Sequence, residues 1–160
     1  MTAKILQHIV FSIGKEFYGV GIDDVQEIVR VPDITAVPDT PDFLEGVINL
    51  RGKVIPVIDL RKRLRLQEAE RTKSTRVLVA ENKETKSLVG LIVDSVSEVR
   101  KIQPGAVEEP PEMVSAIGVE YITGVARIED RLIILLDLSK IFSVDDMKRT
   151  GTGTEVLQAA

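Results

Sequence analysis

The chain has 160 residues and a net charge of −4, enough length for one compact domain or two small subdomains. Nucleic-acid binders generally carry a basic surface, so the charge argues against nucleic acid as a partner. Cysteine is absent, which excludes disulfides, thiolate metal sites and thiol catalysis. Because no signal peptide or long apolar run is visible, we expect a soluble cytoplasmic protein that does not insert into membranes.

Short apolar strands joined by tight turns are predicted from the N-terminus onward. Residues 8–13 and 17–22 flank a turn at Gly14-Lys15-Glu16, the pattern of a β-hairpin. Residues 23–29 begin with two aspartates, which suit a helix start, and predict a short helix.

A second hairpin is predicted further along the first half. Residues 47–50 and 54–58 flank Arg51-Gly52-Lys53, where glycine can adopt a positive φ. Pro56 interrupts the second strand and predicts a sheet edge or a bulge. Residues 59–64 begin with aspartate and predict another short helix.

The second half of the chain repeats the first. Phe43–Leu60 aligns without a gap with Tyr121–Leu138, and Tyr18–Val31 aligns with Val89–Ile102. Two matches in the same order indicate an internal duplication, with seven extra residues within 103–120 of the second copy. Identical pairs include Gly19/Gly90, Asp23/Asp94, Glu27/Glu98, Gly46/Gly124 and Asp59/Asp137.

The duplication predicts a mainly β protein with two pseudo-symmetric barrels of about five strands and a few short helices. We place subdomain one at about residues 8–66, subdomain two at about 75–142, and a polar C-terminal tail at about 148–160. A barrel of about 70 residues has little core of its own, so the two should pack on each other.

Catalytic and cofactor motifs are absent from the sequence. His8 is the only histidine, and the pairs Asp23-Asp24 and Asp145-Asp146 lack the ligand spacing of a calcium loop. No phosphate-binding glycine motif and no GxSxG serine occurs. The sequence therefore predicts a non-enzyme without metal or cofactor.

Residues 61–76 contain seven basic and two acidic residues. We interpret this basic segment as a solvated connection between the halves. A surface for an acidic partner or the inner membrane leaflet is the alternative.

The run FLEGVINLRGKVIPVIDLR, Phe43 to Arg61, resembles a signature of the CheW family, and supporting matches extend over about residues 7–147. The resemblance implies two five-stranded SH3-like β-barrels around a shared apolar core. It also implies a stand-alone adaptor that couples transmembrane chemoreceptors (methyl-accepting chemotaxis proteins) to the histidine kinase CheA in chemosensory arrays. The alternative is an adaptor for a different pathway, such as one controlling pili or development, with its own kinase.

The resemblance also implies site residues. Val25, Glu27 and Ile28, with Val89 opposite, match the family's receptor-binding groove. On the predicted helix Val25 and Ile28 share one face, and plain core is the alternative for both. Glu27 has a copy at Glu98, which favours a structural role common to both barrels.

For contact with the kinase regulatory domain, the resemblance implies Ile34, Val37 and Val54 in the first half. A second contact is expected near Glu108 and Met113, where acidic residues and a methionine replace the basic and aromatic residues common in the family. Arg51 is assigned a structural or signalling role rather than direct partner binding.

Overall fold

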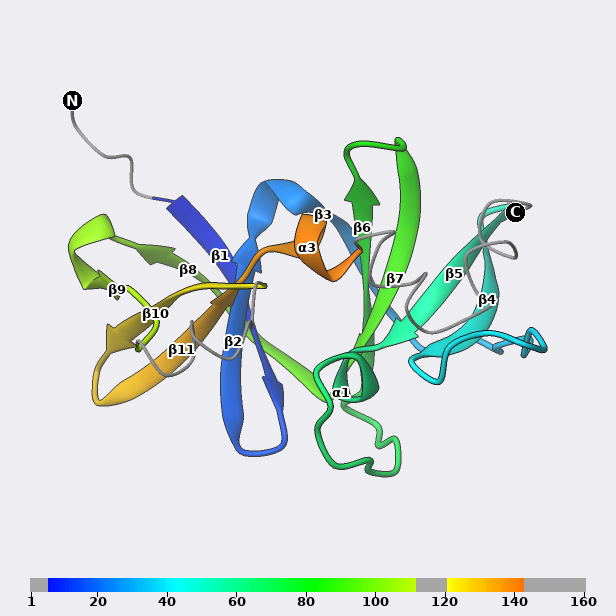
Figure 1. Cartoon of the computed structure of the whole chain (residues 1–160), viewed down its shortest axis with the longest axis horizontal. Helices are drawn as coiled ribbons and strands as arrows, with labels where there is room; N and C mark the ends of the chain where they lie inside the picture. The colour runs from blue at the N-terminus through cyan, green and yellow to red at the C-terminus, as the bar shows by residue number, and fades with distance from the viewer. Residues whose placement is uncertain (1–5, 112–120, 143–160) are drawn as a thin grey trace.

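Two strongly curved sheets lie side by side and share one apolar core (Figure 1). The structure, a computed structural model, describes residues 6–111 and 121–142. The strands are β1 (Leu6–Ile13), β2 (Glu16–Gly21), β3 (Val25–Arg30), β4 (Leu44–Leu50), β5 (Lys53–Asp59), β6 (Arg76–Asn82), β7 (Ser87–Val93), β8 (Ser95–Ile102), β9 (Val107–Glu108), β10 (Ile122–Ile128) and β11 (Arg131–Leu136). The short helices are η1 (Ile22–Asp24), α1 (Leu60–Arg63), η2 (Pro104–Ala106) and α3 (Leu138–Ile141).

The strands form two barrels that differ in how they use the chain. The order β3-β6-β7-β5-β4 uses one continuous stretch and forms what we call the central barrel. The order β8-β1-β2-β11-β10-β9 joins strands from both ends of the chain and forms the terminal barrel. The predicted class, mainly β with two SH3-like barrels, is confirmed.

The predicted boundaries at about 66 and 75 do not separate the barrels, because each barrel takes strands from both repeats. Parallel pairing joins β2 to β11, with Tyr18 opposite Ile134, and β5 to β7, with Ile58 opposite Leu91. Every one of these strands is largely apolar, so each is stable only where neighbours cover it. The repeats therefore complete each other's sheets instead of folding separately.

The two barrels nevertheless keep the same strand order, as the duplication predicts. When the two strand orders are read from β8 and from β3, strands that are equivalent in the two repeats occupy the same positions. The single bridge of Thr35 to Val47 occupies the place that β9 takes beside β10, where Glu108 faces Val125. Val47 and Val125 were aligned from the sequence, so register as well as order is repeated.

Both predicted hairpins are present, and so are the predicted helix capped by Asp59 and its equivalent in the other repeat, capped by Asp137. The Asp59 carboxylate accepts the Arg61 backbone N–H at 3.0 Å, and Asp137 accepts the Ser139 N–H at 3.0 Å. The β4–β5 turn has φ of +52° at Arg51 and +85° at Gly52. The β10–β11 turn likewise has two positive φ values, at Glu129 and Asp130, so tight two-residue turns form there without glycine.

The helix predicted over residues 23–29 is wrong. Within this segment only Asp23 and Asp24 are helical, as part of η1. Val25 to Arg30 form strand β3, which pairs antiparallel with β6. Exposure alternates residue by residue along β3, as expected for a strand with one covered face. The β-branched residues of this segment favour a strand, and the open edge of β6 provides a pairing partner. Together they outweigh the helix-start signal of Asp23.

Pro56 does not mark a sheet edge, since β5 lies between β4 and β7. Val47, opposite Pro56, uses both its backbone N–H and its C=O on Thr35, at 2.9 Å each, on the side away from β5. The Pro56 nitrogen consequently faces away from β4, and pairing with β7 begins only at Val57. The missing N–H therefore breaks no ladder bond.

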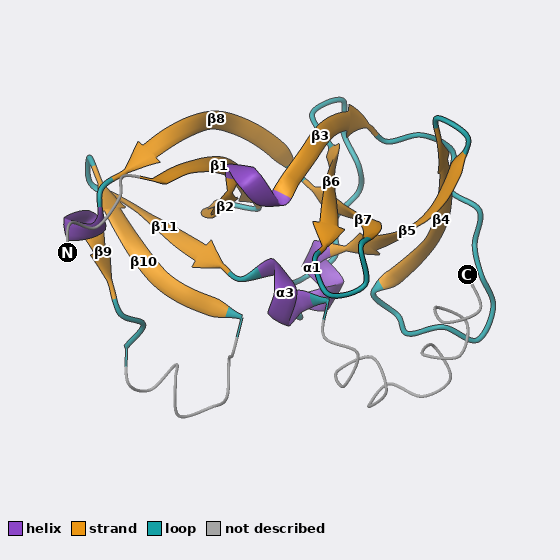
Figure 2. Cartoon of the chain, turned by 90° about the horizontal axis from the view of Figure 1, so that it is seen from above, coloured by secondary structure: helices purple, strands orange, loops and turns teal. Residues whose placement is uncertain are grey.

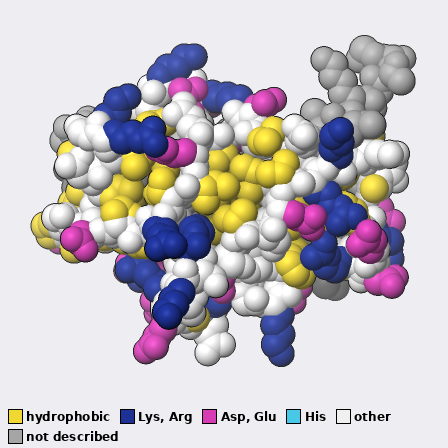
Figure 3. Space-filling model, turned by 180° about the vertical axis from the view of Figure 1, so that it is seen from behind, with side chains coloured by type: hydrophobic (Ala, Val, Ile, Leu, Met, Phe, Trp, Pro, Cys, Tyr) yellow, Lys and Arg dark blue, Asp and Glu magenta, His cyan; other side chains and the backbone are white. Residues whose placement is uncertain are grey.

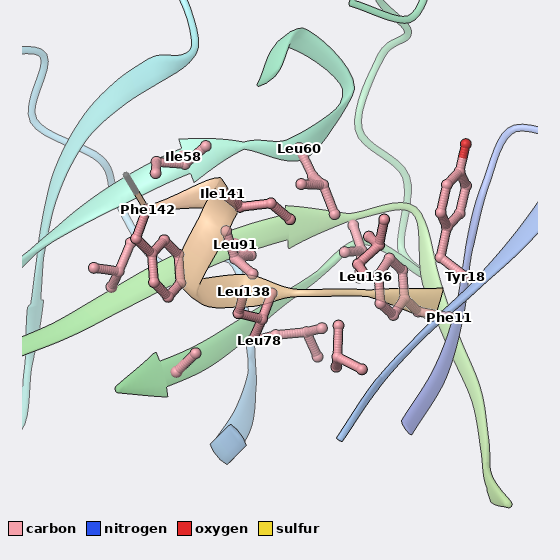
Figure 4. Close-up of a cluster of buried hydrophobic side chains, with 14 of the residues drawn as sticks. Phe11, Tyr18, Ile58, Leu60, Leu78, Leu91, Leu136, Leu138, Ile141 and Phe142 are labelled. Carbon is pink, nitrogen blue, oxygen red and sulfur yellow. The ribbon is translucent and has the colours of Figure 1, made fainter. Parts of the chain in front are cut away.

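The apolar core has three parts, one inside each barrel and a larger one between them. In β1, Val10 faces the interior of the terminal barrel, while Ile9 and Phe11 face the shared core. In β6, Val77 faces the central barrel and Leu78 the shared core. Figure 4 shows the shared core, with Phe11, Tyr18, Ile58, Leu60, Leu78, Leu91, Leu136, Leu138, Ile141 and Phe142 converging from both barrels and both α-helices.

Two arginines brace the junction between the barrels. The Arg61 guanidinium binds both carboxylate oxygens of Asp94, which also accepts the Gly14 backbone N–H at the β1–β2 turn. The Arg63 guanidinium lies 5.2 Å from the ring centre of Phe43 and 5.6 Å from that of Tyr121. These aromatic residues are equivalents in the two repeats, so Arg63 links matching points of both barrels.

Gly46 gives a test of the β4 geometry. It has φ of +147°, and a Cβ there would lie 2.1 Å from the Thr35 carbonyl oxygen. Gly46→Ala should cost roughly 3 kcal/mol of unfolding free energy, because that backbone region is nearly restricted to glycine and the Thr35 bridge must break. Gly105→Ala, at a glycine with nothing within 4 Å and no positive φ, is the matched control. Equal melting temperatures for the two variants would contradict this role.

The Asp94 brace predicts a pH-dependent contribution to stability. Burial raises the pKa of the Asp94 carboxyl, but hydrogen bonds from Arg61 and Gly14 outweigh burial and bring the pKa below its ordinary value of 3.8. A carboxyl with a depressed folded-state pKa stabilises the fold above its unfolded pKa, and that contribution is lost as pH falls through the folded pKa.

Asp94→Asn should lower the unfolding free energy by about 1 kcal/mol at pH 7, a modest value because solvent reaches about a third of the carboxylate. The difference from the unchanged protein should shrink below about pH 4 as its own carboxyl protonates. Urea unfolding from pH 3 to pH 7 measures this, with Asp23→Asn, the exposed equivalent in the other repeat, as control. A pH-independent difference would argue against the ion pair.

Candidate functional site

Exposed large hydrophobic residues occur at equivalent places on the two barrels. Ile28 and Val99 are equivalents, with exposed fractions of 39% and 51%, and so are Val54 and Leu132, at 66% and 52%. Among the described residues, the fifth exposed large hydrophobic is Leu66, in the connection after α1. Single exposed apolar residues are common on protein surfaces, but these four occupy matching positions in the two repeats.

A hydrophobic area also lies near the junction of the barrels. Figure 3 shows apolar side chains gathered near the middle of one face, with charged side chains around them. β3 and β8 curve along one side of the molecule (Figure 2), and their equivalent residues Val25 and Val96 are half-buried against the shared core. An apolar partner could therefore contact both barrels at once.

The structure separates the four residues assigned to the receptor groove. Val25 and Ile28 do not share a face, because β3 is a strand: Val25 packs on the shared core and Ile28 points to solvent. Val89 is 7% exposed and belongs to the shared core. It lies two strands from Val25, with Ala80 of β6 in register between them. Ile28 and Glu27 are thus the members with side chains at the surface.

Glu27 forms an ion pair with Arg51, with 2.9 Å between Oε2 and Nη2. β3 and β4 are opposite edges of the central sheet, so this contact between β3 and the β4–β5 turn draws the edges together. The Arg51 side chain is 79% exposed, whereas that of Glu27 is 22% exposed. Arg51 therefore braces its barrel through the Glu27 carboxylate.

Glu98 makes the equivalent contact in the terminal barrel, but with more partners. It accepts a hydrogen bond from Arg131 at 2.9 Å and lies 3.5 Å from Arg100. Arg131 also lies over the Phe17 ring, 4.5 Å from its centre, and Arg100 binds Glu129 at 3.1 Å. The Arg131 hydrogen bond, with the charges of both arginines, lowers the pKa of Glu98.

The contact of Arg131 with Glu98 was not expected from the sequence. Arg51 aligns with Glu129, and Arg131 supplies the cation of the terminal barrel two residues later. The sequence did contain a signal for this contact. Each repeat has a glutamate at the same position and a basic residue at the hairpin turn that follows later in the chain.

The residues assigned to the kinase face are only partly brought together. Val54 is exposed, whereas Ile34 is half-buried against the central-barrel core and Val37 is half-buried in the loop before β4. Glu108 lies on β9 of the terminal barrel, 3.2 Å from Arg127. Met113 lies outside the described residues.

The basic segment is engaged largely within the chain. Arg61 binds Asp94, Lys62 lies 2.7 Å from Glu45, and Arg71 lies 3.3 Å from the same Glu45. These side chains line a hollow where burial raises the pKa of Asp59 and the Glu45 hydrogen bond raises that of Lys62. Internal pairing favours the interpretation as a connection over a surface for membranes.

Within residues 6–111 and 121–142, no three His, Asp or Glu side chains come together as metal ligands. No helix in that part of the chain has the length and apolar character needed to span a bilayer.

Known proteins resemble this chain over nearly its whole length. A family model described as CheW-like domain matches residues 7–146. "Chemotaxis protein CheW" of Treponema pallidum is 38% identical over 146 residues, covering 89% of this chain and 85% of that protein. The protein of the same name from Bacillus subtilis is 35% identical over 144 residues, covering 88% and 91%.

A solved structure agrees with the fold. The crystal structure of scaffolding protein TtCheW from Thermoanaerobacter tengcongensis has a TM-score of 0.79 and 41% sequence identity, covering 88% of this chain and 94% of that one. The repeated barrels, the matched residues 7–146 and these identities lead to one conclusion: the chain belongs to the CheW-like domain family.

Proposed function

We propose that the protein is a non-catalytic adaptor that couples transmembrane chemoreceptors to a CheA-type histidine kinase. The main support is the family match over residues 7–146, with relatives named as chemotaxis proteins and a neighbour titled a scaffolding protein. The adaptor works in the cytoplasm and is recruited to membrane-associated receptor arrays. It supplies fixed geometry between partners and no chemistry of its own.

The receptor site we propose is centred on β3. Ile28 offers an exposed apolar side chain, and Glu27, on the opposite face of the strand, offers a half-buried carboxylate paired with the β4–β5 turn. Val25 and Val89 lie beneath, packed in the shared core, and hold the strand in place. The apolar area near the barrel junction suits one face of an amphipathic helix from the receptor tip.

The kinase face we propose is on the central barrel, with Val54 as its exposed anchor and the half-buried Ile34 and Val37 as further members. A second contact, near Glu108 of the terminal barrel and near Met113 in the sequence, would let each adaptor bind two kinase regulatory domains. The exposed apolar character of Val54, 66% accessible on a short strand, supports the first of these contacts.

Co-sedimentation tests the coupling as a whole. The purified protein is mixed with receptor-containing membranes, with and without the kinase. It should sediment with receptor membranes alone and should increase the amount of kinase that sediments. Binding to receptor-free membranes at the same level would refute the receptor role.

Val54→Asp should weaken kinase binding about 30-fold, equivalent to about 2 kcal/mol, because a carboxylate would be desolvated at an apolar contact. Since Val54 is exposed, the variant should fold normally, which circular dichroism checks. Leu66→Asp, at an exposed leucine outside both proposed faces, is the matched control. Equal kinase pull-down by the two variants would show that the face is assigned wrongly.

Glu27→Lys should weaken receptor pull-down per folded molecule, whereas Glu98→Lys should leave it unchanged. The second variant should show the lower melting temperature, because its new cation would lie between Arg100 and Arg131. In the first variant the exposed Arg51 can turn into solvent, so the fold should lose less stability. If receptor binding per folded molecule is the same for both, Glu27 has no part in the site.

A further inference from the structure

A single exposed segment joins the two repeats. The first repeat ends with α1 and the second begins with β6, and residues 65–74 between them are all exposed and belong to no helix or strand. Figure 1 shows this connection at the outer edge of the molecule, below α1. The next residue, Thr75, is buried, so the exposed part ends where the second repeat begins.

The non-covalent contacts between the repeats are extensive. Four of the described strand pairs, β1 with β8, β2 with β11, β3 with β6 and β5 with β7, join one repeat to the other. The shared core likewise combines Phe11 and Leu60 from the first repeat with Leu78 and Leu136 from the second. All of these contacts need one first repeat and one second repeat, but none requires that both belong to the same molecule.

The connection is held in two separate parts. Its first part is bound to the first repeat, where Arg61 donates to the Gln67 carbonyl at 2.6 Å and Arg71 lies 3.3 Å from Glu45. Within the described residues, no hydrogen bond or ion pair joins residues 65–71 to β6 or to a later strand. These contacts therefore stay intact whichever copy of the chain supplies the second repeat.

The second part of the connection is bound to the second repeat. The Thr72 backbone N–H donates to the Thr75 Oγ1 at 2.8 Å, and the Arg76 guanidinium donates to the Lys73 carbonyl at 2.7 Å. The two parts meet at the peptide bond between Arg71 and Thr72, and no described hydrogen bond or ion pair of the connection crosses this joint. Backbone rotation there separates the parts without loss of a polar contact of the connection, which is the property of a hinge.

We propose that a second copy of this chain binds by exchange: each copy opens at the Arg71–Thr72 joint and packs its second repeat against the first repeat of the other. Every strand pair and core contact between the repeats is then remade between copies. In dilute solution the linked repeat, at its high effective concentration, keeps the chain closed. Exchanged dimers therefore form at high protein concentration, especially when chains refold together.

The exchanged dimer carries two complete pairs of barrels. The proposed receptor site and kinase face are built on the barrels and not on the connection, so both surfaces are present twice. An adaptor of this kind binds two receptor tips or two kinase domains at once and gains avidity toward clustered partners. The exchange itself does not depend on the proposed function, since it follows from the strand pairing.

A pair of cysteines reports the exchange, because the chain has none of its own. Ser12 of β1 and Ser95 of β8 are register partners from different repeats, and their Oγ atoms lie 2.6 Å apart, so Ser12→Cys/Ser95→Cys can form a disulfide. The variant is refolded with reductant at about 1 mM, a typical effective concentration for linked units. Monomer and dimer fractions are separated by gel filtration, oxidised, and run on a denaturing gel without reductant.

The dimer fraction should run as covalent dimers and the monomer fraction as single chains, whose consumed thiols verify that the disulfide forms. Ser12→Cys and Ser95→Cys single variants refolded together should also give covalent heterodimers, whereas Ser12→Cys refolded alone is the matched control and should give none. A dimer fraction that runs as single chains would show association through a surface. That result, or the absence of any dimer after refolding, would overturn the exchange.

Insertions at the joint test the hinge. Two prolines inserted between Arg71 and Thr72 stiffen the connection in an extended form and should raise the dimer association constant about ten-fold. Two glycines inserted at the same place keep the length but let the chain reverse, so this variant should dimerise like the unchanged protein. Equal dimer fractions for the two insertions would overturn opening at this joint.

Discussion

The parallel pairing of β2 with β11 and of β5 with β7 is the constraint on which the rest of the structure depends. Each pair joins strands from different repeats, so neither barrel can close until both halves of the chain are present. In this arrangement β1 and β6 are apolar on both faces. One face of each strand points to the interior of its own barrel, and the other points to the shared core. Sheet hydrogen bonds therefore tie the two repeats together inside each barrel, and the shared core packs the barrels on each other, which suits a protein whose proposed role is to hold partners in a set geometry.

Duplication has kept the framework and allowed the surfaces to diverge. The equivalent glycines Gly46 and Gly124 both admit a crossing strand that a side chain would block. The equivalent glutamates also keep one task, closing a sheet against its own hairpin. Around them the cations differ: Arg51 is largely exposed on one barrel, and Arg131 is stacked on an aromatic ring on the other. Such asymmetry gives two similar barrels different accessible chemistry without any change of fold.

Much of the candidate site could be named from the sequence, but its geometry could not. Ile28, Glu27 and Val54 were assigned by resemblance, and all three have side chains that reach the surface. The face shared by Val25 and Ile28 was wrong because a helix start was assumed where the edge of β6 recruits a strand. The pairing of Glu27 with Arg51 joins residues from opposite edges of a sheet, and closure of that sheet is a long-range property.

By itself, the sequence determined the β class, the duplication, both hairpin turns and the aspartate caps. These depend on contacts within a few residues or on direct comparison of the repeats, so local chemistry specifies them. Only the tertiary structure decided which strands share a barrel, since an apolar strand satisfies its backbone equally well against any partner of suitable register. How firmly each arginine is held was decided in the same way, because it depends on whether an aromatic ring or solvent lies behind the guanidinium.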